Sequence, residues 1–176
     1  MNGGTRPLDP ATPARGVTGG ESAGEVYKKL SEWVDAIDYL RMQRFYLKTH
    51  YKIERDLRYM PGELDRIYDV LTVYDRESNM ECVVCPICGW LSKPYQVKIS
   101  FEPTARMRYF ARIASILMRH ARVAHMNLFE RVRKGGRIYG VTERALYRCC
   151  ECGAVEDGVI EIISHYVAEH MEVRPR

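Results

Sequence analysis

Apolar residues near the start of the chain recur at steps of four and three, which is the spacing of one face of an α-helix. They are Val26, Leu30, Trp33, Ile37 and Leu40. The pattern predicts a helix over 25–60, because Pro61 and Gly62 then interrupt helical backbone geometry. A second series predicts a shorter helix over 63–74, with one face formed by Leu64, Ile67, Tyr68 and Leu71. Two neighbouring amphipathic helices of this kind predict a helical hairpin.

The rest of the chain mixes strand and helix signals. Alternating apolar positions predict a strand. These positions are Tyr95, Val97, Ile99 and Phe101. A long predicted helix over 103–134 begins with a proline and is ended by two glycines. A strand over 138–148 and a last helix over 159–170 follow, so the predicted fold class is α+β and mostly helical.

Composition separates a leading tail from the remainder of the chain. Residues 1–23 are rich in Gly, Pro and Thr and have no apolar period, so we expect a disordered tail. The helical hairpin would take 24–78, a first, enlarged module 79–134 and a second module 135–176. The sequence has neither a run of about 18 apolar residues nor a basic segment followed by an apolar one. We therefore expect a cytoplasmic protein that contacts no membrane.

The six cysteines and five histidines are unevenly distributed. The cysteines gather in 82–88 and 149–152, and four of the histidines form two pairs with the same His-x4-His spacing. Thiols stay free in a reducing compartment, so this grouping favours metal binding over disulfides. The candidate ligands of two sites are Cys85, Cys88, His120 and His125 for the first and Cys149, Cys152, His165 and His170 for the second.

The second set has the spacing Cys-x2-Cys-x12-His-x4-His between Cys149 and His170. Tyr147 precedes its first cysteine by two residues, and Ile162 precedes its first histidine by three. In these residues the segment resembles the C2H2 zinc-finger family, which includes free-standing proteins of archaea and their viruses. The resemblance implies a ββα module in which a cysteine turn and a helix bind one Zn²⁺ tetrahedrally.

One position departs from the family pattern. Glu156 stands where the family has an aromatic residue, so Val155 or Val159 must fill that part of the core. The positions that read bases in the family fall on Gly158, Glu161 and Ser164. Acidic residues in and before this helix repel phosphate, so we expect the second module to be structural or to contact protein.

The first set repeats these parts with 31 residues between Cys88 and His120. In both sets a glycine follows the second cysteine and an apolar residue precedes the first histidine by three. We interpret this as an internal duplication that binds two Zn²⁺ per chain. Two alternatives stay open: the four cysteines of both CxxC turns could form one zinc ribbon, or Cys82 could replace Cys88. Cys82 and Cys150 are otherwise spare thiols.

Basic residues gather in the long predicted helix and just after it. Between Ala105 and Arg137 there are nine basic residues and one acidic residue, a local charge of +8. Four arginines fall within an arc of about 80° on a helical wheel, opposite an apolar face. They are Arg108, Arg112, Arg119 and Arg122, and Arg131, Arg133 and Lys134 follow them. Such a stripe can neutralise phosphates, which predicts a nucleic-acid-binding protein, in the form of a DNA-binding transcriptional regulator.

Other interpretations compete with this one. The basic face could be solvated, or paired with acidic residues such as Glu32, Asp35 and Asp38. The zinc modules could form a protein–protein interaction adaptor, and the apolar face of the 24–60 helix could bind a protein partner or a second copy. An enzyme is not expected, because catalytic zinc keeps an open ligand position and both predicted sites have four protein ligands.

Overall fold

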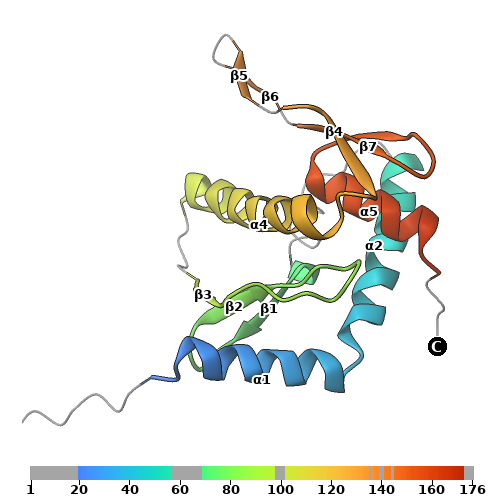
Figure 1. Ribbon diagram of the computed structural model, residues 1–176. Helices are drawn as coiled ribbons and strands as arrows, with labels where there is room; N and C mark the ends of the chain where they lie inside the picture. The colour runs from blue at the N-terminus through green and yellow to red at the C-terminus, as the bar shows by residue number, and fades with distance from the viewer. Residues whose placement is uncertain are drawn as a thin grey trace, which may run out of the picture.

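The computed structural model describes residues 20–56, 69–97, 102–134, 136–138, 141–143 and 145–172. Its helices are α1 (Ala23–Ala36), α2 (Tyr39–Asp56), α4 (Pro103–Ala124) and α5 (Val159–His170). Its strands are β1 (Thr72–Asp75), β2 (Met80–Val83), β3 (Tyr95–Gln96), β4 (Phe129–Arg133), β5 (Gly136–Ile138), β6 (Val141–Glu143), β7 (Leu146–Cys149) and β8 (Val155–Asp157). The α+β class is thereby confirmed (Figure 1). None of the described helices combines the length and apolar character that crossing a membrane requires.

The predicted continuous helix over 25–60 is wrong, because the chain bends between α1 and α2. Helix α1 starts at a capping box in which Ser22 and Glu25 bond each other's backbone N–H groups. It ends at Ile37, and Asp38 takes the left-handed conformation with φ of 54°. The buried face of α1 consists of Val26, Leu30 and Val34. Trp33 and Ile37, which were predicted to share that face, are exposed.

Strands β1, β2 and β3 form an antiparallel sheet that lies between α1 and α4 (Figure 1). Successive residues of a strand point to opposite faces, and here both faces are buried. Cys82 and Val84 pack with α1, whereas Val83 and Cys85 belong to the cluster that contains the buried side of α4. The predicted helix over 63–74 is wrong at its end, because strand β1 begins at Thr72. Residues 63–68 of that prediction lie outside the described part of the chain.

The strand predicted from Tyr95 onward is seen only over β3, since 98–101 lie outside the described residues. Helix α4 begins at Pro103 as predicted, but it ends at Ala124 rather than at Lys134. The segment beyond it turns back and forms strand β4. The helical part of this region is thus ten residues shorter than predicted, since Lys134 is ten positions beyond Ala124.

The second sheet has the strand order β4-β7-β8 and carries α5. Strand β4 pairs antiparallel with β7, with an irregularity between Arg131 and Arg133. Strands β5 and β6 pair with each other and extend this hairpin away from the body of the protein (Figure 1). The predicted strand over 138–148 is thus divided among the end of β5, β6 and β7, and its residues 139, 140 and 144 lie outside the described part of the chain. The last helix is confirmed with its predicted bounds.

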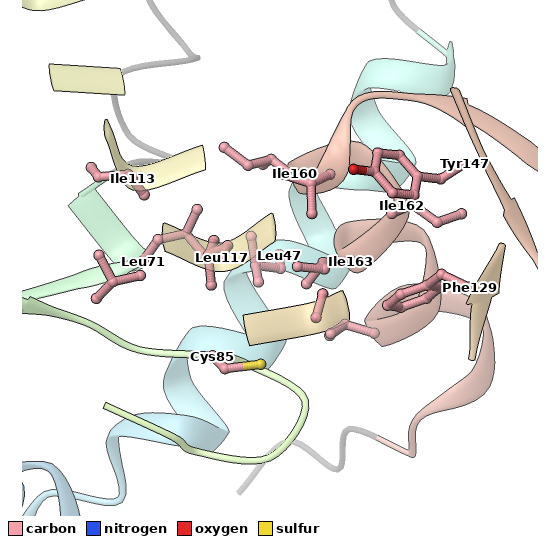
Figure 2. Packing of buried hydrophobic residues seen from close by; sticks show 14 of the residues in the cluster. Leu47, Leu71, Cys85, Ile113, Leu117, Phe129, Tyr147, Ile160, Ile162 and Ile163 are labelled. Carbon is pink, nitrogen blue, oxygen red and sulfur yellow. The ribbon is translucent and has the colours of Figure 1, made fainter. Parts of the chain in front are cut away.

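One hydrophobic core connects the two sheets (Figure 2). Leu47 of α2, Leu117 of α4 and Ile163 of α5 are all buried in it. Helix α5 contacts α2, α4, β7 and β8, and eight of its twelve residues are buried. Of the two valines expected in the core near this helix, Val159 is buried and Val155 is exposed. The two predicted modules therefore share their interior.

Truncation of this core on α4 tests the packing. Leu117→Ala removes a side chain that is 0% exposed, so we expect the free energy of unfolding to fall by about 2–5 kcal/mol. Met107→Ala on the same helix is the matched control, because Met107 is 70% exposed. That change should cost less than about 0.5 kcal/mol. Urea denaturation followed by circular dichroism measures both, and equal losses would contradict the packing described here.

Candidate metal centres

The first CxxC turn follows β2 and is closed by backbone hydrogen bonds. The N–H of Gly89 donates to the carbonyl of Cys85, and the N–H of Cys85 donates to the carbonyl of Trp90, each over 2.8 Å. Gly89 has a φ of +78°, in the left-handed region that favours glycine. A Cβ at this position would also lie 2.7 Å from the Cδ1 atom of Leu40. The sequence Cys-x2-Cys-Gly thus suits a turn that directs both sulfur atoms to one side.

The second CxxC turn is closed by the same two backbone hydrogen bonds as the first. The N–H of Gly153 donates to the carbonyl of Cys149, and the N–H of Cys149 donates to the carbonyl of Ala154, again over 2.8 Å. Gly153 has a φ of +77°. The turn connects β7 to β8, and α5 follows. Two turns with the same pattern at the same relative positions support the predicted internal duplication.

The ends of α4 and α5 bring two histidines to each turn. In the first site the Nε2 atom of His125 lies 3.4 Å from the Sγ of Cys85, and that of His120 lies 3.2 Å from the Sγ of Cys88. The second site pairs its first cysteine with its second histidine in the same way. There the Cys149–His170 and Cys152–His165 distances are 3.4 and 3.2 Å. In each group of four, the ligand atoms lie within 4.8 Å of one another.

The environment of the donor atoms suits a cation. Burial raises the pKa of the Cys85 thiol and of the Cys149 thiol, so a thiolate at either position needs a compensating positive charge. Burial also lowers the pKa of His120 and His125, which keeps both imidazoles neutral and able to act as ligands. A tetrahedral zinc site would separate sulfur from nitrogen by about 3.6 Å, close to the contacts in both groups. The two groups can therefore each hold a metal ion.

The alternatives for the cysteines are decided by this geometry. Each CxxC turn faces its own pair of histidines, so the described residues form two Cys₂His₂ groups rather than one four-cysteine group. Cys82 belongs to neither group, because it points to the opposite face of the sheet and packs against α1. Cys150 is exposed and also lies outside both groups.

Side chains around the second site were not predicted from the sequence. The Nδ1 atom of His165 lies 3.1 Å from the hydroxyl of Tyr51, which donates to Glu156 over 2.6 Å. The Nδ1 atom of His170 lies 3.0 Å from a carboxylate oxygen of Glu151. Of these partners, Glu156 was the one that the sequence had marked, because it departs from the family pattern. Tyr51 carried no signal, because it comes from a distant part of the chain.

The first site has a different neighbour. The Trp90 ring stacks on the His120 ring, with centroids 4.1 Å apart and planes 7° from parallel. Trp90 directly follows Gly89, so the closing hydrogen bond of the CxxC turn also positions this ring. Stacking limits rotation of the imidazole, which leaves its Nε2 directed at Cys88. The sequence pattern assigned no role to Trp90 at this site.

The predicted basic residues lie on two different elements. Seven of them are exposed: Arg108, Arg112, Arg119 and Arg122 on α4, Arg131 and Arg133 on β4, and Lys134 directly after it. Arg112 also lies over the ring of Tyr95, 4.1 Å from its centroid. Within the described part of the chain, no ion pair involves the four α4 arginines.

The acidic residues suggested as partners for these arginines lie elsewhere. Helix α1 packs on the face of the first sheet opposite to α4 (Figure 1). Glu32 pairs with Lys28 of its own helix, and Asp38 pairs with Arg41. The sheet between the two helices therefore separates the α1 acids from the arginine face.

Comparisons with protein-family models, with curated proteins and with solved structures found no match to this chain. Function is therefore inferred from the geometry of the two Cys₂His₂ groups and of the basic surface.

Adjacent cysteines give a matched test of the second metal centre. Cys149→Ser removes a ligand, so we expect the metal content per chain to fall from two ions to one. Cys150→Ser makes the same chemical change at the next residue, which is exposed and outside the group, and should leave both ions bound. Elemental analysis after gel filtration measures the content. Equal metal content in the two variants would contradict the assignment of Cys149.

Proposed function

We propose that this chain is a zinc-stabilised protein that binds nucleic acid, in the form of double-stranded DNA, and acts as a transcriptional regulator. The observation that carries the proposal is the exposed face of α4, which presents four arginines and lies opposite the buried face that anchors the first Cys₂His₂ group. In this proposal each Zn²⁺ has a structural role. It fixes the end of a helix to a CxxC turn and thereby sets the direction of the arginine face.

The dimensions of α4 support a fit to a DNA groove. Its 22 residues give a length of about 33 Å, close to one turn of B-form DNA. A helix with its side chains is about 10–12 Å wide, and the major groove is about 12 Å wide. The small residues Ala111 and Ser115 lie on the same exposed face as the arginines, so they allow close approach. Arginines along this face would contact phosphates and the acceptor edges of guanine.

The strand that follows α4 supports the proposal as well. Arg131, Arg133 and Lys134 are exposed on and beside β4, and the β5–β6 hairpin continues from this strand beyond the body of the protein (Figure 1). A basic strand beside a basic helix gives the backbone of DNA a second element to bind. The binding surface proposed here thus runs from α4 onto β4.

Helix α5 is not part of this surface. In C2H2 fingers the metal-binding helix itself enters the groove. Here Ser164, one of the expected base-reading positions, is buried, and α5 packs against α2 and α4. The second metal centre therefore supports the core, and α4 alone among the two metal-binding helices presents an exposed basic face.

A second candidate function is supported by a separate observation. Helices α1 and α2 expose the large apolar side chains of Trp33, Met42 and Phe45. Exposed apolar groups of this size are typical of surfaces that bind protein. On this basis the chain would be a zinc-dependent adaptor that binds a protein partner or a second copy through α1 and α2.

The arginine face is tested by a charge-matched pair of variants. Arg108, Arg112, Arg119 and Arg122 are all replaced by alanine in the first variant. If each binds one phosphate, the slope of log affinity against log salt should become shallower by about 3.6, and affinity for duplex DNA should fall by at least about tenfold. Fluorescence anisotropy at several salt concentrations, on protein loaded with zinc, measures both quantities.

The control removes four positive charges from other elements. Lys28, Arg41, Arg76 and Lys93 are replaced by alanine in the second variant, which has the same net charge as the first. We expect this variant to retain most of the DNA affinity and nearly the same salt slope. Equal losses in both variants would show that only net charge matters and would overturn the assignment of α4. Binding of neither DNA nor RNA by the wild-type protein would favour the adaptor.

A further inference from the structure

Each histidine of the second metal centre contacts a side chain that is itself hydrogen-bonded to a further side chain. His170 contacts Glu151, and a second oxygen of that carboxylate accepts a hydrogen bond of 2.8 Å from the hydroxyl of Tyr166. His165 contacts Tyr51, which donates to Glu156. His165 thus contacts a tyrosine that is bonded to a glutamate, whereas His170 contacts a glutamate that is bonded to a tyrosine. Partners of this kind orient a metal ligand and select its tautomer.

The direction of the hydrogen bonds follows from which nitrogen faces the cysteine sulfur atoms. The Nε2 atom of His165 is the one near Cys152, so a metal ion would bind there and the proton would be on Nδ1. The Nδ1–H group then donates to the Tyr51 oxygen, and the Tyr51 hydroxyl donates onward to Glu156. Each proton in this series of hydrogen bonds, from His165 through Tyr51 to Glu156, therefore has an acceptor. A ring flipped by 180° would lose both the metal and the bond to Tyr51.

Tyr51 reaches the site from α2, 114 positions before His165 in the sequence. It is buried where α2 packs on α5, and its ring meets the His165 ring edge to face with centroids 5.8 Å apart. A buried hydroxyl without partners is costly, so its two partners at the metal site favour the docked position of α2. The contact therefore links a segment outside both predicted modules to a metal ligand.

We propose that Tyr51 is a positioning residue for the second metal centre, and that docking of α2 and metal binding at that centre strengthen each other. The inference rests on the proposed zinc sites. Coupling of this type is reciprocal: if α2 holds the His165 ring in the geometry that binds metal, then bound metal holds α2 in place by the same factor. Among the described residues, the contacts of Tyr51 at a metal centre are those with the second one, so the first centre serves as an internal reference.

Tyr51→Phe removes the hydroxyl and keeps the ring. We expect the zinc affinity of the second centre to fall about tenfold, the lower end of the usual effect of losing such a partner. The affinity of the first centre should stay unchanged. Competition with a chromophoric chelator resolves the two centres, and ¹⁵N spectra of the histidine rings assign the weakened one. The Nδ1–H signal of His165 should also exchange faster with solvent in the variant.

Tyr39→Phe is the matched control. Tyr39 lies in the same helix and is buried, and its hydroxyl donates to the backbone carbonyls of Val70 and Thr72 rather than to a metal ligand. Tyr39→Phe should lower the stability of the fold without changing the zinc affinity of one centre more than that of the other. Glu156→Gln, which leaves an amide oxygen for Tyr51 to bond, should weaken the second centre by less than Tyr51→Phe does.

The outcomes separate this inference from the proposed function. If Tyr51→Phe binds zinc at both centres as the wild type does, or weakens both centres equally as a general loss of stability would, Tyr51 does not position His165. A wild-type chain that binds no zinc would instead overturn the metal centres themselves. Selective weakening of the second centre, together with faster amide hydrogen exchange in α2, would establish the coupling.

Discussion

The burial of α5 constrains the rest of the molecule. This helix carries two candidate metal ligands, and most of its other residues pack against α2, α4 and the second sheet. A helix enclosed in this way cannot also enter a DNA groove. The proposed DNA-binding surface is consequently set by α4, whose buried side carries Ile113 and Leu117 and whose other side carries the arginines.

Each Cys₂His₂ group lies where a CxxC turn meets the C-terminal part of a helix. The CxxC turns are short and are closed by only a few backbone hydrogen bonds, and their first cysteines are fully buried. Burial disfavours the thiolate, whereas coordination to zinc favours it, so metal binding and burial depend on each other. The sites have the same ligands and the same turn but different surroundings. The first relies on ring stacking by Trp90, and the second on carboxylates and tyrosines.

Sequence patterns predicted the parts of this structure that depend on local spacing. The CxxC and His-x4-His pairs, the proline at the start of α4 and the bounds of α5 all follow from residues a few positions apart. The errors come from distant contacts. Residues 125–134 contain no helix-breaking glycine or proline, so their strand pairing with β7 was not visible. Thr72 and Val73 are β-branched, a strand signal that the apolar period of the preceding residues concealed.

In the proposed function, the connection between the two candidate metal centres would determine how the protein approaches DNA. Tandem zinc fingers follow the major groove because each finger adds its own helix. In this chain the connecting segment is itself a strand of the second sheet. Phe129 pairs with Cys149 and meets the Tyr166 ring, and the N–H of Cys150 donates to the carbonyl of Leu128. The start of β4 is thereby fixed to the second CxxC turn and to α5. The two centres are thus joined through the second sheet, and in the proposed function a single helix with its neighbouring strand would provide the whole contact. Such a surface spans about one helical turn of DNA, so a longer target would require two copies of the chain.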